Sequence, residues 1–232
     1  MPLDALTSDL ALRHRAAEAR AAIAIAQSEP QLGRIALVSS FGVEAAVLLH
    51  LVAEAAPEMP VLFVDTGKHF DETLAYQRSL ARRLGLRDLR VIGPDPADLE
   101  AQDRYGALYS FDSAACCHLR KVAPLQQALR GFDGWITGRK RYQGGARAQL
   151  QVFEADAGSG KLKINPLAHW SADVLRAYAR LHALPPHPLV ARGYLSVGCA
   201  PCTTRPLDGT DARSGRWAGQ DKTECGIHSA AP

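Results

Sequence analysis

Four of the five cysteines of the chain form two pairs, and the fifth stands alone near the C-terminus. Cys116 and Cys117 are adjacent, two residues separate Cys199 from Cys202, and Cys225 lies in a Glu-Cys-Gly-Ile-His segment. Adjacent cysteines do not readily bond to each other, and a Cys-x-x-Cys loop is more often a metal or redox site than a structural disulfide. The pattern predicts a metal centre of four thiolates together with a separate reactive thiol.

The two pairs lie too far apart in the chain to form a local metal-binding knuckle, so the fold must bring them together. Four thiolates suit either a zinc ion or an iron–sulfur cluster. The side chains of adjacent ligands diverge, which is awkward for one tetrahedral ion, whereas a cluster offers several irons at different corners. Ligand geometry favours the cluster over zinc, with buried unligated cysteines as the third alternative. The spacing alone does not decide among the three.

Composition limits the classes of protein to which the chain can belong. Its 232 residues, 47% of them hydrophobic, suffice for one α/β domain of good size. A formal net charge of +3 is too small for a general nucleic-acid binder, and local basic clusters at 139–141 and 213–222 suit a small anionic ligand instead. The sequence has no signal-peptide core and no apolar run of membrane-spanning length. We therefore expect no membrane partner and a reducing, cytoplasmic location.

Hydrophobic periodicity predicts short strands that alternate with helices. The expected strands span 34–38, 60–64, 89–92 and 134–137, and the expected helices span 9–28, 43–56, 70–84, 112–130 (with a kink at Pro124) and 171–182. Such alternation implies an α/β fold with a mostly parallel sheet and helices on both faces. We expect a single domain over 1–232, with a helical extension at 1–30 and a mobile catalytic tail at 206–232.

Three polar loops are expected at the carboxyl ends of the strands, where ligands bind in a parallel sheet. Residues 39–44 combine hydroxyl groups and a glycine before a helix, which suits a phosphate, although many such turns are merely helix caps. Residues 65–69 offer a carboxylate and a backbone turn to a sugar or base, or form a plain turn. Residues 137–147 crowd four cations among glycines, which favours a bound anion over a solvated basic face.

Taken together and in this order, these segments resemble the assimilatory phosphosulfate reductases, and most closely the iron–sulfur adenylyl-sulfate (APS) reductases. The resemblance spans roughly residues 34 to 228. It rests on the Ser-Ser-Phe-Gly-Val-Glu turn, Asp65-Thr66-Gly67, Cys116-Cys117 followed by Lys121, the Thr-Gly-x-basic-x-x-Gln loop, Cys199-x-x-Cys202, Arg213-x-x-Arg216-Trp217 and Lys222-x-Glu-Cys-Gly-x-His. It implies an adenine nucleotide α-hydrolase-like fold.

The resemblance also implies a role for the lone cysteine. The Cys225 thiolate would attack the sulfur of APS, release AMP and form an enzyme-bound thiosulfonate, from which thioredoxin or glutaredoxin releases sulfite. A thiolate needs positive charge nearby, and four candidates flank it in the sequence: Lys222, His228, Arg213 and Arg216. A position in a tail allows the thiol to close over substrate and then to swing out towards a protein reductant.

Lys121 follows Cys117 by four residues, so the two share a face if this segment is one continuous helix. The resemblance gives Lys121 a bridging role, since an anionic cluster beside an anionic substrate needs a cation between them. It also implies that Cys116, Cys117, Cys199 and Cys202 ligate a 4Fe–4S cluster that itself carries no electrons. An exposed helical lysine is the alternative for Lys121.

Further substrate contacts are implied for nine residues. They are Ser40 and Gly42 for the phosphate or adenosine, Asp65 and Gly67 for the nucleoside, Arg139, Gln143 and Arg147 for a loop over the site, and Arg213 and Arg216 for the phosphosulfate. Departures from the family pattern at Ala45, Tyr142 and 144–145 leave open a preference for 3′-phosphorylated APS (PAPS) or a dual specificity. The paired cluster cysteines favour APS. A homo-oligomer would fit the family.

Two other classes of protein compete with the reductase. An ATP-using transferase of similar fold with a structural zinc would need a Ser-Gly-Gly-x-Asp-Ser pyrophosphate loop, where this chain has Ser-Ser-Phe-Gly-Val-Glu. A non-enzymatic iron–sulfur sensor would need a helix-turn-helix or a broad basic face, and the sequence offers neither. The sequence therefore favours the reductase.

Overall fold

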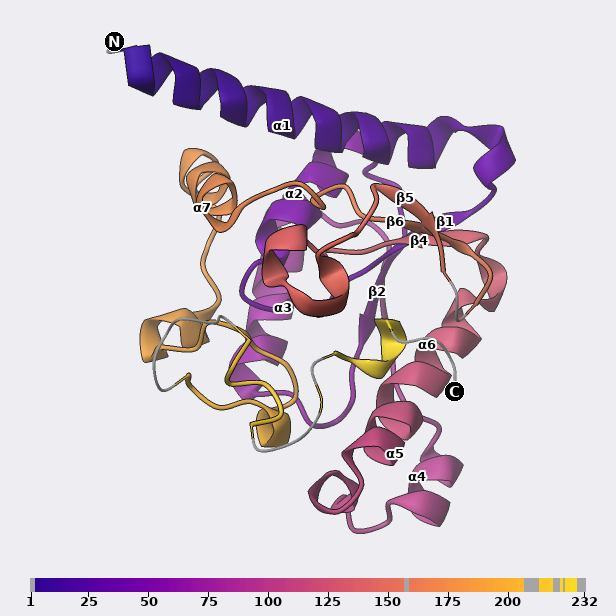
Figure 1. The fold of residues 1–232 in the computed structure, drawn as a ribbon. Coiled ribbons are helices and arrows are strands. Elements are labelled where there is room, and N and C mark those ends of the chain that lie inside the picture. Colours follow the sequence, from indigo (N-terminus) through magenta and orange to yellow (C-terminus); the bar gives the residue numbers. More distant parts are fainter. Residues whose placement is uncertain (1–2, 157–158, 207–212, 219–221, 223, 229–232) are drawn as a thin grey trace.

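A six-stranded sheet forms the centre of the computed structural model, which describes residues 3–156, 159–206, 213–218, 222 and 224–228 (Figure 1). The strands are β1 (Ile35–Val38), β2 (Val61–Val64), β3 (Leu89–Ile92), β4 (Gly134–Ile136), β5 (Phe153–Ala155) and β6 (Leu162–Ile164), in the spatial order β3-β2-β1-β4-β6-β5. All neighbours run parallel except the β5–β6 hairpin at one edge. The predicted, mostly parallel sheet is confirmed, and the four predicted strands match β1 to β4 within one residue at each end.

The sequence pattern did not predict the β5–β6 hairpin. Each strand is three residues long, and charged Glu154 and Lys163 interrupt its apolar character. Those two residues stand opposite each other in the antiparallel register. The hairpin brings both charges beside the loop that follows β4, which the sequence had placed near the ligand site.

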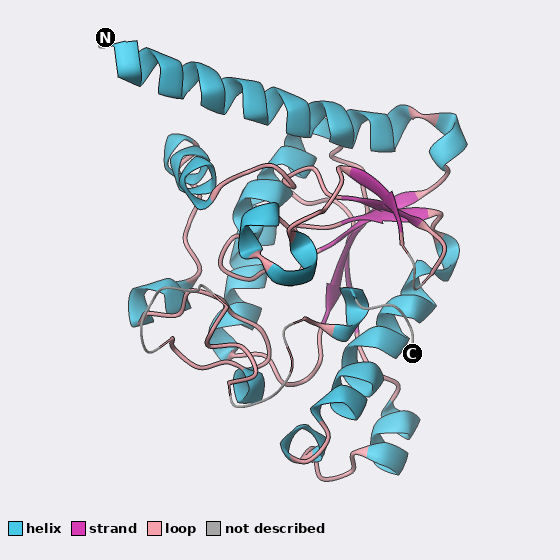
Figure 2. Cartoon of the chain, viewed as in Figure 1, coloured by secondary structure: helices cyan, strands magenta, loops and turns pink. Residues whose placement is uncertain are grey.

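Helices cover both faces of the sheet, as predicted (Figure 2). The helices are α1 (Leu3–Ser28), α2 (Ala45–Ala55), α3 (Asp71–Leu84), α4 (Pro96–Gln102), α5 (Ser113–Cys117), α6 (Ala123–Ala128) and α7 (Ala172–Leu181). Side chains alternate along β1, so that Leu37 joins α1, α2, α3 and α7 in one apolar core while Ala36 and Val38 join α6 in another. The loops at the strand ends are thus held between two packed layers.

The N-terminal helix α1 is longer than the sequence predicted. Ala16, Ala19, Ile23 and Ala26 recur at helical spacing and are buried in the core that also contains α2 and α7. Small residues at this spacing let α1 approach α2 closely. Among the described residues, no helix is both long enough and apolar enough to cross a membrane.

The segment predicted as one helix over 112–130 changes type along its length: α5, a π-helical turn, α6 and a 3₁₀ turn at Leu129–Gly131. Asp112 caps α5 by accepting hydrogen bonds from the amides of Ala114 and Ala115 at 3.0 and 2.8 Å. A π-helical turn, His118–Val122, separates α5 from α6. Proline at position 124 lacks an N–H and cannot complete the preceding α-helical hydrogen bond, and the wider π turn accommodates it without ending the helix. The expected kink is therefore a change of helix type just before Pro124.

A buried histidine makes the stability of the fold sensitive to mild acid. His187 is fully buried, its Nδ1 accepts the amide of Leu189 at 3.2 Å, and its Nε2 lies 3.1 Å from the hydroxyl of Thr73. Burial lowers the pKa of His187 to about 4. Because the unfolded chain binds this proton more tightly, the free energy of unfolding should fall by about 2 kcal/mol between pH 7.5 and pH 5 through this group alone. Urea denaturation at the two pH values measures it.

The matched variant is His187→Asn, whose amide oxygen can still accept the amide of Leu189 without titrating. We expect the variant to lose less stability than the parent chain between pH 7.5 and pH 5. Equal losses in the two proteins would contradict the assignment of this pH dependence to His187.

Candidate active site

A cleft of about 1360 Å³ runs along the carboxyl ends of the parallel strands. Its walls include segments that are far apart in the chain: the β1–α2 loop, the loop after β4, residues 194–198 and the C-terminal tail. Ligand sites of this kind are concave and mostly preformed, and the volume accommodates a nucleotide. Two of the three loops expected at this edge, residues 39–44 and 137–147, each contribute several residues to the walls.

Ser40 and Gly42 lie on the cleft wall directly before α2. Between them, Phe41 is buried with a φ of +49° and packs edge to face on Phe63, with the ring centroids 5.5 Å apart. A bulky residue in the left-handed region is strained, and here packing holds it. The amide of Ala45 donates to the carbonyl of Gly42 at 3.0 Å, so the loop leads directly into the first turn of α2. A helix start of this kind is suited to a phosphate.

Of the second expected loop, residues 65–69, only His69 is part of the cleft wall. The Asp65 carboxylate accepts the amide of Gly67 at 2.9 Å, and Gly67 has a φ of +65°. The flanking residues that do line the cleft are Val64 and His69. Asp65 and Gly67 therefore form a tight turn in this structure, and their predicted contact with the nucleoside stays a prediction.

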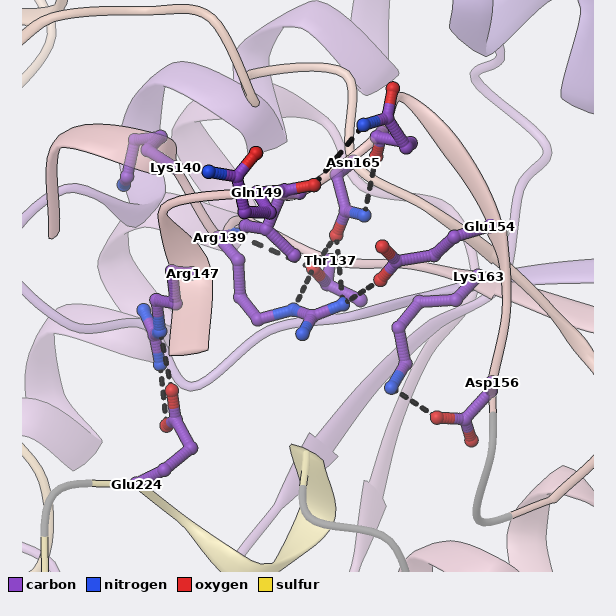
Figure 3. A network of polar contacts seen from close by, with 12 residues as sticks. Thr137, Arg139, Lys140, Arg147, Gln149, Glu154, Asp156, Lys163, Asn165 and Glu224 are labelled. Atoms are coloured by element: carbon purple, nitrogen blue, oxygen red, sulfur yellow. Dashed lines mark hydrogen bonds and ion pairs between the residues drawn. The ribbon is translucent and has the colours of Figure 1, made fainter. Parts of the chain in front are cut away.

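The cations of the third loop, residues 137–147, are largely paired with carboxylates of the protein itself (Figure 3). The pairs are Arg139–Glu154, Lys140–Glu44 at 2.7 Å and Arg147–Glu224 at 2.5 and 2.6 Å. We expected an external anion to neutralise this loop. Three glutamates from distant segments supply that negative charge, and sequence reasoning did not find them.

Arg139 is 7% exposed and points into the polar network under the loop (Figure 3). Besides its ion pair with Glu154, its Nε donates to the hydroxyl of Thr137 and its Nη2 to the amide oxygen of Asn165, both at 3.3 Å. These contacts tie the loop to the β5–β6 region. The predicted contact of Arg139 with substrate stays a prediction.

Glu44 ties the first loop to the third. Its carboxylate accepts hydrogen bonds from Lys140 at 2.7 Å, from the amide of Gln143 at 3.1 Å and from the hydroxyl of Tyr142. Burial would raise the pKa of Glu44, but the charge of Lys140 and these hydrogen bonds outweigh it and lower the pKa. An ionised Glu44 thus anchors the loop over the cleft.

The tail brings Cys225 to the cleft, where Lys121, Arg213 and Arg216 are also part of the wall. The guanidinium groups of Arg216 and Arg213 lie 4.6 and 5.8 Å from the ring centre of Trp217. Cation–π contacts of this kind fix a cation while leaving its charge available. Sequence reasoning placed these cations beside Cys225, and the structure brings them together.

His228 does not supply the positive charge that was expected beside Cys225. Its ring stacks on the buried Trp135, with the centroids 5.5 Å apart and an interplanar angle of 3°. Burial, reinforced by the charges of Arg139 and Arg147, lowers the pKa of His228 well below its ordinary value. His228 is therefore neutral at physiological pH and anchors the tail by stacking.

All four paired cysteines line a second, smaller cavity next to the cleft. Cys116, Cys117 and Cys199 are buried and Cys202 is half-buried, and none of them forms a disulfide. The hydroxyl of Thr66 lies 3.2 Å from the Cys199 sulfur. The fold thus brings the two pairs to one place, as the sequence required.

The donor set of this cavity is four cysteine thiols, which fits an iron–sulfur cluster. The four thiols surround a cavity, and the cations Lys68, Arg120 and Lys121 line the same cavity. Thiolates spread around a space and flanked by positive charge are the arrangement that an anionic iron–sulfur cluster needs.

Lys121 lines both the cysteine cavity and the cleft. Burial would lower the pKa of Lys121, but the thiol groups of Cys225, Cys199 and Cys117 outweigh it and raise the pKa. The π turn changes the helical spacing on which the prediction rested, yet Lys121 still reaches the cavity of Cys117. A permanent cation stands between the four cysteines and Cys225.

Arg120 is a site residue that sequence reasoning missed. It is 6% exposed, donates to the Asp103 carboxylate at 2.9 and 2.6 Å, and donates to the carbonyl of Thr66 at 2.9 Å. Burial would raise the pKa of Asp103, but the amide of Leu108 and Arg120 lower it. The sequence spacing could have identified Arg120, because it follows Cys116 by four residues and so belongs on the same side of a helix.

The sheet order, the cleft at the strand ends and the helices on both faces define an adenine nucleotide α-hydrolase-like protein. Within that class, the chain belongs to the phosphoadenosine phosphosulfate reductase domain family, whose family model matches residues 34–205.

Relatives from bacteria support this assignment. An adenosine 5′-phosphosulfate reductase of Mesorhizobium japonicum is 53% identical over 194 residues, which cover 84% of this chain and 76% of the relative. A protein of the same name from a Chelativorans species is 49% identical over 226 residues, covering 97% of this chain and 91% of the relative.

Solved structures agree with the fold. The phosphoadenylyl-sulfate reductase of Candida auris, crystallised as a phosphate complex, has a TM-score of 0.67 at 27% identity and covers 78% of this chain and 88% of its own. An FMN adenylyltransferase of Candida glabrata has a TM-score of 0.61 at 15% identity, covering 84% of this chain and 66% of its own, which supports the fold alone.

Proposed function

We propose that this chain is an oxidoreductase that reduces adenylyl sulfate to sulfite and AMP in assimilatory sulfate reduction. Its bacterial relatives carry the name of that reductase. The observation that carries the proposal is the position of one thiol: Cys225 shares the cleft with the β1–α2 loop, Lys121 and Arg216. One nucleotide bound in the cleft thus meets a nucleophile, a helix start that suits a phosphate, and cations that suit a sulfonyl group.

The chemistry begins with attack of the Cys225 thiolate on the sulfur of APS. The bond between that sulfur and the bridging oxygen breaks, its electron pair leaves with AMP, and the SO₃ group stays on Cys225 as a thiosulfonate. A dithiol reductant then attacks the Cys225 sulfur, expels sulfite and is oxidised to a disulfide through a mixed disulfide. We propose thioredoxin or glutaredoxin as that reductant.

Lys121, Arg213 and Arg216 stabilise the charges of this reaction. Each lines the cleft together with Cys225. A cation near the thiol favours its ionised form, and cations near the sulfonyl oxygens and the leaving phosphate favour the transition state. Substrate contacts through Ser40 and Gly42 at the start of α2, and through Arg139, Gln143 and Arg147 of the third loop, belong to the same proposal.

Cys116, Cys117, Cys199 and Cys202 would hold a 4Fe–4S cluster in the cavity that they line. When bound, the cluster supplies a fixed negative charge and a structural link rather than electrons. Lys121 lies between this cavity and the cleft. Arg120 also lines the cavity, and it donates a hydrogen bond to the carbonyl of Thr66. Lys121 thereby sets the charge that the substrate meets, whereas Arg120, paired with Asp103, holds the backbone beside the cysteine cavity.

We further propose one reductase domain over 1–232, which acts in the cytoplasm as a homo-oligomer. Residues 1–30 form its helical extension, and residues 206–232 form the tail that carries the nucleophile. Residues 207–212, 219–221, 223 and 229–232 of this tail lie outside the described residues.

The test is anaerobic sulfite production from APS and, separately, from PAPS, with thioredoxin and its reductase supplied. We expect kcat/KM for APS to exceed that for PAPS on the order of 10²-fold, because the cations of the third loop are already engaged by glutamates. Strong turnover of PAPS would favour the alternative of a PAPS or dual-specificity reductase. No sulfite from either nucleotide, with the cluster intact, would exclude the reductase and favour the sensor.

A further inference from the structure

The residue directly before the nucleophile is a carboxylate for which the proposed chemistry has no role. The Glu224 side chain is 16% exposed and receives two hydrogen bonds from Arg147, at 2.5 Å from Nε and 2.6 Å from Nη2. It also accepts the backbone N–H of Cys225 at 2.9 Å. A bidentate arginine–carboxylate contact of this burial is geometrically specific as well as strong.

Arg147 is itself held in place by the rest of its loop. Its Nη1 donates to the side-chain oxygen of Gln143, and the side-chain nitrogen of Gln143 donates to Glu44 at 3.1 Å. A continuous series of hydrogen bonds therefore runs from the β1–α2 loop to the amide of Cys225. The series begins at a loop that the packed core holds in place, and it ends at the tail.

On the other side of the nucleophile, the tail packs on the π turn and on the sheet. A Cβ atom at Gly226 would lie only 3.1 Å from a methyl group of Val122, so that the tail approaches the π turn closely. His228 stacks on Trp135. Cys225 thus lies between an apolar and aromatic anchor on one side and the ion pair of Glu224 on the other.

We propose that Glu224 is a positioning residue: by docking on Arg147 it seats the Cys225 thiol over the cleft. The inference rests on the proposed function, because seating matters only if this thiol reacts with a bound nucleotide. Without the contact to Arg147, the tail keeps its stacking on Trp135 and the longer contact of Glu224 with Arg213 at 3.4 Å, but Glu224 loses its bidentate partner. The contact opens when the tail turns out to meet a reductant and closes again when it returns.

Alkylation of Cys225 tests the seating without any turnover. The cluster-loaded, substrate-free protein is treated with N-ethylmaleimide, and the peptide carrying Cys225 is followed by mass spectrometry up to the pH at which the rate no longer rises. This plateau rate reports access to the thiol rather than its pKa. We expect Glu224→Gln and Arg147→Lys each to raise the plateau rate about tenfold, the effect of weakening one charge-assisted contact.

A matched control comes from the same loop. Glu154→Gln weakens the Arg139–Glu154 pair, which is similarly buried but does not contact the tail, and should leave the plateau rate at the parent value. The double variant Glu224→Gln/Arg147→Lys should be no faster than Glu224→Gln alone, since both substitutions weaken the Arg147–Glu224 contact and only Glu224→Gln also affects the longer contact with Arg213. Plateau rates of both single variants within about twofold of the parent would overturn the proposal, as would multiplying effects in the double variant.

The reaction provides a second readout. If the chain reduces APS, Glu224→Gln should lower kcat for thiosulfonate formation on the order of tenfold to 100-fold, with a smaller change in KM, because a misplaced nucleophile costs rate more than binding. An unchanged kcat would overturn the positioning role. Faster alkylation in a chain that reduces no APS would overturn the proposed function and leave the docking contact standing.

Discussion

Replacement of Cys225 by serine is expected to lower sulfite release from APS by at least about 10³-fold while the protein keeps its brown cluster. A serine hydroxyl is not ionised at neutral pH and cannot form a thiosulfonate. The four cysteines of the neighbouring cavity are untouched, so the substitution separates the nucleophile from the ligand set. Anaerobic sulfite assays and iron analysis on the same preparation measure both quantities.

Cys202→Ser provides the matched cysteine control. Cys202 is half-buried like Cys225 but lines the cysteine cavity, so we expect this variant to lose iron as well as activity. With APS and no reductant, the peptide carrying Cys225 in the parent chain should gain the mass of one SO₃ group. Sulfite release by the Cys225→Ser variant at the parent rate would refute the assignment of the nucleophile.

Lys121→Ala should lower kcat/KM for APS by about 10²-fold to 10³-fold. Lys121 lines both cavities, and its charge stands between the thiolates of the cluster and the nucleophile. Its removal leaves negative charge facing negative charge across a partly buried site, where Coulomb repulsion is weakly screened. The reductase assay at several APS concentrations separates the effect on kcat from that on KM.

Lys68→Ala is the control for Lys121→Ala. Lys68 lines the cysteine cavity but not the cleft, and its ammonium lies 5.6 Å from the ring centre of Tyr109. It therefore tests the general effect of removing positive charge beside the cluster, and we expect a much smaller loss of activity. Equal losses in the two variants, or loss of iron from both, would show that Lys121 acts through the cluster alone.

Most of the fold could be predicted from the sequence, because the central strands are short, mostly aliphatic runs bounded by turns. The runs that became β1, β2 and β4 are almost wholly buried and apolar, and β3, although half-exposed and interrupted by Arg90, keeps three aliphatic residues out of four; β5 and β6 each have a charge in three residues and were not predicted. Helix α4 was also missed, although Asp95 before Pro96 is a recognisable helix start and caps the helix at 2.8 Å. Its seven residues are too short for periodicity to show.

The parts of the site that depend on residue type could be predicted from the sequence, whereas the parts that depend on tertiary contacts could not. Paired cysteines and a lone cysteine have few uses, and their pattern led to the cavity and the cleft. The partners of the loop cations come from the β1–α2 loop, the β5–β6 hairpin and the tail, at positions that no local spacing connects. The neutral state of His228 likewise depends on its stacking against Trp135.

The π turn between α5 and α6 determines what a change in the length of this segment would do. A π turn holds one more residue than an α-helical turn, so deletion of one residue within 118–122 would let the segment become an uninterrupted α-helix. The helices on either side would keep nearly the same relative orientation, because the π turn already absorbs the extra residue. Lys121 lies within the turn, so the deletion would change the direction of its side chain relative to Cys116 and Cys117. The extra residue therefore determines where Lys121 points rather than how α5 and α6 pack.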